Sequence, residues 1–229
     1  MIYITFSNIK KDKDYNKIDK GLFNYIDGVV SVYNSFDPAH QLDHCNIVIN
    51  RGIQYAKEWN KLNPDKTVDL NIVFVVCALH DIGLQFDRET HNIHSSNLIK
   101  KDKNLKKWFN EEEINIIANA VEDHRASLKH PIRNIYGQIV SEADRNHPSS
   151  IRELIQRSVK YNIHHNPNLP YRDLVNNVIN NTYSGKHAKV FFDIPMVQNK
   201  KKELANLMKD KREVRKEALR MFKELNGGL

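Results

Sequence analysis

VVCALHDIGL, residues 75–84, is the stretch that decides how this chain folds. It continues an apolar run that begins at Ile72, and it ends in two metal-capable side chains, His80 and Asp81, before Gly83 can end the element. Burying a carboxylate without a partner costs several kcal/mol, so an aspartate carried into the interior needs a cation, a donor network or a metal. The pair alone is equally compatible with an exposed helix end, and the rest of the chain decides between the two interpretations.

The composition indicates a globular, helix-rich protein. Its 229 residues suffice for one ordinary domain with a real core, 40% of them are hydrophobic, and Gly and Pro are few. Cys45 and Cys77 both lie in periodic apolar segments, which suits reduced thiols in a reducing compartment. No secretory signal is visible at the N-terminus, and the apolar run is far too short to span a bilayer. We therefore expect a soluble, cytoplasmic protein without a membrane partner.

The positive charge is compatible with several partners. A formal net charge of +7 suits nucleic acid, an anionic small substrate, or solubility alone. Much of the excess lies in residues 199–225, where Lys and Arg mix with Glu and with apolar residues at helical spacing. Such a segment is more often a solvated amphipathic helix than a nucleic-acid arm. A nucleic-acid partner therefore stays open without being favoured, and the oligomeric state is unknown.

Hydrophobic periodicity predicts helices along almost the whole chain. Apolar residues recur at three- and four-residue steps, and the apolar run before His80 is compatible with a buried strand but is favoured as a helix by its surroundings. Asp37-Pro38 is expected to cap and start the second helix, whose stripe then includes His40 and His44. The predicted helices cover residues 17–33, 37–60, the apolar run to His80, 91–100, 111–124, 132–145, 151–161, 171–183 and 196–225.

The predicted fold class is therefore all-α. We expect a bundle of about seven to nine helices, with residues 1–6, MIYITF, as the one candidate for a short strand. The expected organisation is a single domain over residues 1–229, with the site in a core of about residues 37–146 and a helical extension over about 149–229.

Six polar residues stand on predicted apolar helix faces or at helix ends: His44, His80, Asp81, His91, His124 and Asp144. Four neutral imidazoles and two carboxylates favour a divalent transition metal such as Mn, Fe, Co, Ni or Zn over the all-oxygen shell that Ca or Mg prefers, with Mg kept as an option. Six ligands exceed the need of one catalytic ion that keeps an open position, whereas two ions sharing a bridging carboxylate use them all. We expect one or two ions.

The same residues resemble the HD-domain superfamily of metal-dependent phosphohydrolases. The family pattern is a histidine on one helix, an adjacent His-Asp pair, further histidines and a late aspartate, which the six residues above match. Asp37-Pro38-Ala39-His40 and Glu142-Ala143-Asp144-Arg145 also resemble the small nucleotide-hydrolase branch, and the resemblance covers about residues 37–145. The chain departs from that branch at Gln41 and Ile47, so the resemblance leaves the substrate open.

The resemblance implies an HD-domain helical fold and a distribution of ligands over two ions. His44, His80, Asp81 and Asp144 would hold the first ion, and Asp81 would bridge to a second ion completed by His91 and His124. His94 is a nearby alternative to His91. The other histidines are expected to be ordinary loop residues: His130, His147, His164, His165 and His187.

The expected function is metal-dependent hydrolysis of a phosphate ester or anhydride by an activated water, with Asp81 as the catalytic residue. The expected partner is a small phosphorylated molecule, most simply a nucleotide, so nucleotide phosphatase, pyrophosphohydrolase and phosphodiesterase activities are all open. Arg125, Lys129 and Arg145 closely follow expected ligands and, with His40, are expected to bind substrate. The chain has no Walker-type loop and no Gly-x-Ser-x-Gly motif, which argues against those chemistries.

Two alternatives remain open. The same four-histidine, two-aspartate set resembles the di-iron oxygenases of this superfamily, which need iron and oxygen. The chain is also compatible with a non-catalytic regulatory or nucleic-acid-binding module, in which the metals are structural and the basic C-terminal helix contacts phosphates.

Overall fold

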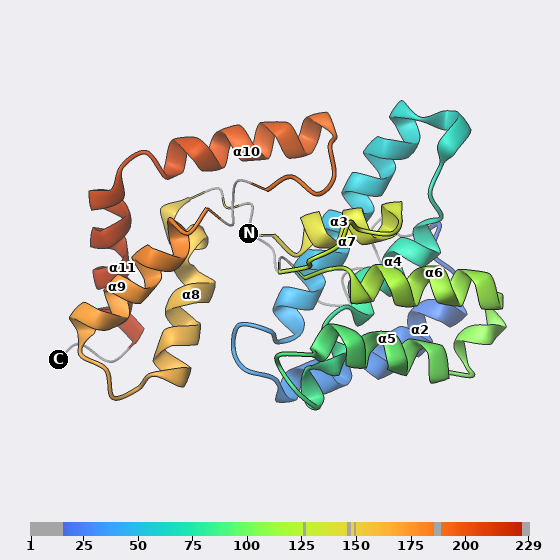
Figure 1. Ribbon diagram of the computed structural model, residues 1–229, viewed down its shortest axis with the longest axis horizontal. Helices are drawn as coiled ribbons and strands as arrows, with labels where there is room; N and C mark the ends of the chain where they lie inside the picture. Colours follow the sequence, from blue (N-terminus) through green and yellow to red (C-terminus); the bar gives the residue numbers. More distant parts are fainter. Residues whose placement is uncertain (1–15, 126, 146–147, 149, 186–188, 226–229) are drawn as a thin grey trace. The chain divides into compact units, whose positions relative to one another are not determined.

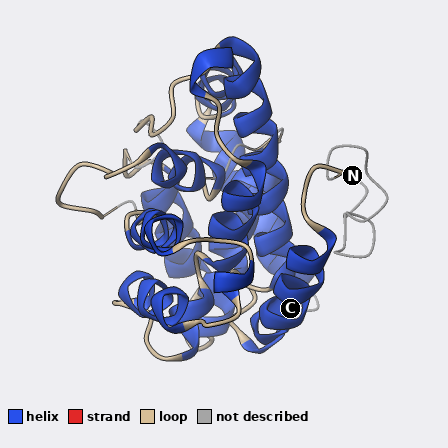
Figure 2. Ribbon diagram, turned by 90° about the vertical axis from the view of Figure 1, so that its right-hand side faces the viewer, coloured by secondary structure: helices blue, strands red, loops and turns tan. Residues whose placement is uncertain are grey.

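The computed structural model describes residues 16–125, 127–145, 148, 150–185 and 189–225 (Figure 1). Over these ranges the chain forms ten α-helices, joined by short 3-10 turns and loops, and contains no strand (Figure 2). The all-α fold class predicted from the sequence is therefore confirmed. The candidate strand at residues 1–6 lies outside the described residues. None of the described helices combines the length and the apolar character needed to cross a membrane.

The chain divides into two compact units. Of the described residues, the first unit contains those up to Phe36 and those of His40–Asp144, and the second contains those of Asp37–Ala39 and Arg145–Leu229. Each unit is built around its own helices. The single-domain organisation expected from the sequence stays a prediction.

Helix α4 (Leu70–Leu79) is the centre of the first unit. Nine of its ten residues are buried, which explains why its sequence is an almost continuous apolar run rather than an amphipathic stripe. It packs against α3 (Leu42–Leu62), α6 (Glu111–Glu122) and α7 (Ile135–Ala143). The sequence-based preference for a helix over a buried strand is confirmed.

The close approach of α3 to α4 depends on Gly52. A Cβ atom added at this position would lie 2.3 Å from the Cys77 Sγ atom, well inside van der Waals contact. The missing side chain therefore lets the two helices meet at the level of Cys77.

The remaining helices of the first unit have clear start signals. Asp19 caps α2 (Lys20–Val29) through the Leu22 N–H, and Asn110 and Glu113 form a capping box at the start of α6. Asn134 accepts from the Gly137 N–H at the start of α7. Helix α5 (His91–Lys101) packs against α6 and against the 3-10 turn Ile82–Gln85 that follows α4.

Helix α3 begins later than predicted, at Leu42 instead of Asp37. The Asp37 carboxylate accepts a hydrogen bond from the Ala39 N–H at 2.9 Å, a local turn that competes with helix formation. Gln41 is the N-cap residue of α3. His40 therefore precedes the helix, and the prediction that it shares the stripe of His44 was wrong.

The second unit contains α8 (Ile151–His165), α9 (Tyr171–Thr182), α10 (Pro195–Leu207) and α11 (Lys211–Leu225). The single helix predicted over residues 196–225 is two helices, which raises the count above the predicted range. Asp210 accepts from the Arg212 and Glu213 N–H groups and so starts α11 as a new helix. The core of this unit consists of Leu154, Ile155, Val159, Leu174, Val175, Val178, Ile179, Leu204, Val214, Ala218, Met221 and Phe222.

Helix α8 also extends four residues beyond its predicted end at Tyr161. His164 and His165 therefore lie in its last turn, and the prediction that they belong to a loop was wrong. A histidine in the last helical turn is favoured because it faces the negative end of the helix dipole. His147 and His187, also expected in loops, lie outside the described residues.

Candidate metal centre

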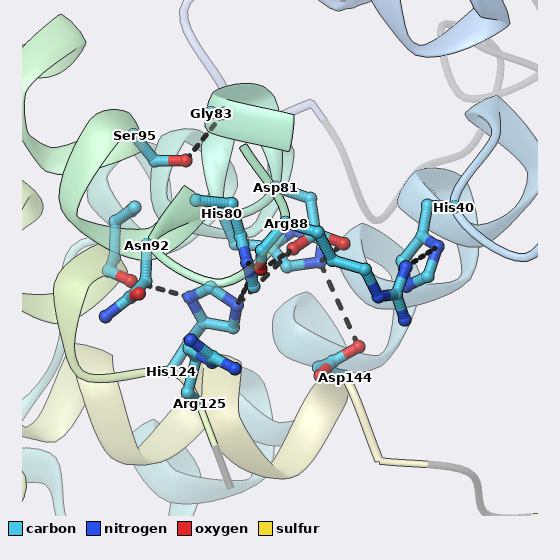
Figure 3. A network of polar contacts seen from close by, with 12 residues as sticks. His40, His80, Asp81, Gly83, Arg88, Asn92, Ser95, His124, Arg125 and Asp144 are labelled. Atoms are coloured by element: carbon cyan, nitrogen blue, oxygen red, sulfur yellow. Dashed lines mark hydrogen bonds and ion pairs between the residues drawn. The ribbon is translucent and has the colours of Figure 1, made fainter. Parts of the chain in front are cut away.

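Five helices deliver the six predicted ligands to one place at their ends. His44 lies in the first turn of α3, and His91 is the first residue of α5. His80 and Asp144 are the C-cap residues of α4 and α7, and His124 follows α6 by two residues. Figure 3 shows His80, Asp81, His124 and Asp144 pointing toward one another between these helices. The structure thus brings together all six side chains that the sequence singled out.

His44, His80 and Asp144 gather on one side of Asp81. The His44 Nε2 atom lies 3.0 Å from Asp144 Oδ1 and 3.9 Å from Asp81 Oδ2. The His80 Nε2 atom lies 3.2 Å from Asp81 Oδ2 and 4.0 Å from Asp144 Oδ1. His44, His80 and Asp81 therefore offer ligand atoms close enough to one another to hold one ion, and Asp144 lies within 4.0 Å of both histidines.

His91 and His124 gather on the other side of Asp81. The His91 Nε2 atom lies 3.2 Å from Asp81 Oδ1, and the His124 Nε2 atom lies 3.4 Å from the same oxygen. The two oxygens of the Asp81 carboxylate therefore face different sets of histidines. This is the arrangement that a carboxylate bridging two ions requires.

Backbone carbonyls determine which nitrogen of each imidazole faces the cluster. His80 Nδ1 donates to the Cys77 carbonyl at 2.9 Å, His91 Nδ1 donates to Arg88 at 2.7 Å, and His124 Nδ1 donates to Val121 at 2.6 Å. A carbonyl oxygen can only accept, so the proton of each neutral ring must be on Nδ1. The Nε2 lone pairs are left directed into the cluster, as metal ligation needs.

The donor set fits a divalent transition metal. The Nε2 atoms of His91 and His124 lie 3.2 Å apart, and two lone pairs at that distance repel each other unless a proton or a cation lies between them. A metal–nitrogen bond of about 2.1 Å separates neighbouring ligands by roughly 3.0 to 3.4 Å. The buried His80 Nε2 atom also makes no well-angled hydrogen bond to any described residue. Both observations are expected of ligands shaped for an ion.

Opposing effects set the protonation of the cluster. Burial alone would raise the pKa of Asp81, but the charge of His80 and the facing imidazoles of His124, His80 and His91 hold the pKa well below its usual range. Burial lowers the pKa of His124. Burial would also lower the pKa of His80, but the charge of Asp81 raises it above the ordinary value. In the metal-free protein the cluster therefore shares protons, which a bound cation would displace.

Tyr33 holds the turn that carries Asp81. Its fully buried hydroxyl donates to the Ala78 carbonyl at 2.9 Å and accepts from the Asp81 N–H at 3.1 Å. These two bonds tie the Tyr33 ring to backbone groups on both sides of the end of α4. Sequence reasoning assigned Tyr33 only to an apolar stripe, because nothing in its spacing distinguishes a positioning hydroxyl from a core ring.

Gly83 lets the start of α5 approach this turn. Its N–H donates to the Ser95 hydroxyl at 2.8 Å (Figure 3). A Cβ atom added at Gly83 would lie 2.1 Å from the His91 carbonyl oxygen and 2.6 Å from the Ser95 nitrogen. Any larger residue would therefore push α5, and His91 with it, away from Asp81.

A buried ion pair fixes the segment after His124. Asp123 is fully buried, and its carboxylate accepts from the Arg133 main-chain N–H at 2.7 Å and from the guanidinium at 2.6 and 3.0 Å. The guanidinium holds residue 133 against the end of α6. The described residues between His124 and Arg133, which include two of the predicted substrate contacts, thus lie in a loop closed at its base.

Of the four residues predicted to bind substrate, three lie in the first unit and the fourth, Arg145, lies in the second. The Arg125 guanidinium contacts the Glu89 carbonyl, and Arg125 and Lys129 line a pocket of about 250 Å³ beside the start of α5. His40 is buried, and its Nδ1 atom lies 3.4 Å from an Arg88 nitrogen. Arg145 belongs to the second unit, where its guanidinium lies 4.3 Å from the centre of the Phe191 ring.

Two residues near the predicted ligands, His94 and Arg88, also bear on the sequence-based prediction. The ring of His94 lies 5.3 Å from that of Phe86, and it is His91 that faces Asp81. Arg88, beside His40, was not singled out from the sequence, because one arginine in a polar segment carries no spacing signal.

Comparison with protein-family models matches residues 42–149 to the HD domain. All six residues of the cluster lie inside the matched range. Comparisons with curated proteins and with solved structures give no match.

Proposed function

We propose that this chain, which belongs to the HD-domain phosphohydrolase superfamily through its residues 42–149, hydrolyses a phosphate ester or anhydride of a nucleotide. A buried His/Asp cluster in an HD domain suggests a metal-dependent hydrolase. The observation that carries the proposal is the placement of Asp81, whose two carboxylate oxygens face separate histidine sets at 3.2 to 3.9 Å. That arrangement supports two ions rather than one.

The proposed ligands follow the two sets. His44, His80, Asp81 and Asp144 would hold one ion, and Asp81, His91 and His124 would hold the second. Imidazole-rich sites of this kind suit Mn, Fe, Co, Ni or Zn, and we propose manganese first. A divalent ion bound there would lower the pKa of a coordinated water toward neutrality and neutralise charge on the non-bridging phosphate oxygens.

The protein's own groups would orient the metal ligands and bind the substrate. The carbonyls of Cys77, Arg88 and Val121 keep the three imidazole rings in the tautomer that ligation needs, and Tyr33 holds the Asp81 backbone. Arg125 and Lys129, which line the pocket beside α5, would contribute positive charge toward an anionic substrate. No protein nucleophile is required, because water is the attacking group.

The test is metal analysis followed by a hydrolysis panel. Purified protein loaded with Mn, Co or Ni should release phosphate or pyrophosphate from at least one nucleotide. Asp81→Asn keeps the shape of the side chain and removes the charge, so it should lose metal from both sets and lose turnover by about 100-fold or more. Asp65→Asn changes an exposed aspartate of the same unit and serves as the matched control.

The same experiment separates the competing functions. Oxygen consumption that depends on iron, without phosphate release, would assign the chain to the oxygenases instead. Strongly salt-dependent binding of DNA or RNA without turnover would favour a binding module. Full activity of Asp81→Asn would refute the proposed role of the cluster.

A further inference from the structure

A short turn fixes the main chain of Arg88 just before α5. The Asp87 carboxylate accepts from the Thr90 N–H at 2.7 Å and from the Thr90 hydroxyl at 2.6 Å, which closes residues 87–90. Within this turn the Arg88 carbonyl accepts from His91 Nδ1 at 2.7 Å. The backbone of Arg88 thereby orients a proposed ligand, and any residue at position 88 could supply that carbonyl.

The side chain of Arg88 has a separate placement. It is exposed, and one guanidinium nitrogen lies 3.4 Å from His40 Nδ1 (Figure 3). A guanidinium can only donate, so the neutral His40 ring accepts through Nδ1 and carries its own proton on Nε2. The His40 ring is buried and lies 6.0 Å from the His44 ring, measured between centroids. A cation and a second N–H donor therefore lie next to the ligand cluster rather than within it.

We infer that Arg88 and His40 bind the phosphate group next to the one that is hydrolysed, so that the substrate carries a diphosphate or triphosphate chain. The inference rests on the proposed function and adds the class of nucleotide. The ions would bind the phosphoryl group that reacts. The next phosphate of the chain would then lie along the edge of the cluster, where His40 is placed. Guanidinium groups match phosphate oxygens with two parallel hydrogen bonds, and an imidazole N–H adds a third donor.

Binding of two non-hydrolysable probes tests the inference without turnover. Methylenediphosphonate contains two linked phosphonates and methylphosphonate contains one, so their difference reports a site for the second group. Titration calorimetry on manganese-loaded protein should show methylenediphosphonate binding about tenfold or more weakly to Arg88→Gln than to the unchanged protein. The affinity of Arg88→Gln for methylphosphonate should stay within about twofold of that of the unchanged protein. Arg88→Lys should bind methylenediphosphonate with intermediate affinity, because lysine keeps the positive charge but lacks the planar guanidinium that makes two parallel hydrogen bonds.

Two controls give the result its meaning. Arg172→Gln removes an exposed arginine from α9 and should leave both affinities unchanged. Manganese content, measured on the same samples, should be equal in Arg88→Gln and the unchanged protein, since the backbone carbonyl that orients His91 is retained. Equal methylenediphosphonate affinity in Arg88→Gln would overturn the inference, and so would a loss of manganese that accounts for weaker binding.

Turnover then separates this inference from the proposed function. With an active enzyme, Arg88→Gln should raise KM for a nucleoside triphosphate by about tenfold or more and leave KM for a monophosphate unchanged. Equal effects on the two substrates would overturn the inference while leaving phosphohydrolysis intact. A protein that shows the probe selectivity but hydrolyses nothing in the panel would refute the proposed function alone.

Discussion

Gly83→Ala should displace His91 from the cluster and selectively weaken binding of the second ion, the one proposed at Asp81, His91 and His124. The new Cβ atom would lie 2.1 Å from the His91 carbonyl oxygen, whereas ordinary contact begins at 3.4 Å, so the start of α5 must retreat by about 1 Å. Metal–ligand bonds tolerate deviations of only about 0.2 Å. The dissociation constant of the ion at Asp81, His91 and His124 should therefore rise by about 100-fold.

The same substitution should lower stability. Overpacking against backbone costs about 3 kcal/mol, which corresponds to a fall in Tm of about 6 to 12 °C for a chain of this length. Thermal unfolding of the metal-free protein measures this cost, and mass spectrometry of the metal-loaded protein counts the ions that remain.

Gly28→Ala is the matched control for Gly83→Ala. It makes the same chemical change within α2, where an added Cβ atom meets nothing within 4 Å. Alanine also has the higher helix propensity, so Tm should stay the same or rise slightly. If Gly83→Ala behaves like Gly28→Ala and keeps both ions, the close packing of α5 against the turn after α4 does not hold His91 in place.

Two further substitutions test how the site is supported. Tyr33→Phe removes only the hydroxyl that bonds two backbone groups at the end of α4. It should lower the free energy of unfolding by about 1 to 3 kcal/mol and weaken metal binding. An unchanged Tm and an unchanged metal affinity would contradict the positioning role of Tyr33. Gly52→Ala should cost about 2 kcal/mol because its Cβ atom meets the Cys77 sulfur, and adding Cys77→Ala should recover part of that loss. Denaturant unfolding of the single and double variants measures the coupling, and simple additivity would show that the contact is not limiting.

Much of the fold could be predicted because helical periodicity and the apolar run of α4 carry strong signals. The six side chains of the cluster were identifiable because they are polar residues on apolar helix faces or at helix ends and because their order matches the family pattern. Their convergence follows from the helix ends, since α3, α4 and α7 pack side by side and present His44, Asp81 and Asp144 at neighbouring termini.

What could not be predicted depends on local competition and on distant contacts. Asp37-Pro38 has the residue types of a helix start, but its carboxylate satisfies a nearby N–H in a turn and α3 begins later. The amphipathic pattern of residues 196–225 is continuous, and the single residue Asp210 caps a new helix within it. Tyr33 and Arg88 contact partners 48 positions away in the chain, and no spacing rule reports contacts of that kind.

The polarity of the helices imposes an order on binding. Three of them, α4, α6 and α7, direct their C-terminal ends at the cluster, and the carboxylates of Asp81 and Asp144 lie at two of those ends. At these three ends, partial negative charge from the carbonyls adds to the full negative charge of the two carboxylates, which attracts cations. A metal bound there would reverse the sign of this part of the site. We therefore expect metal to bind before the proposed phosphorylated substrate.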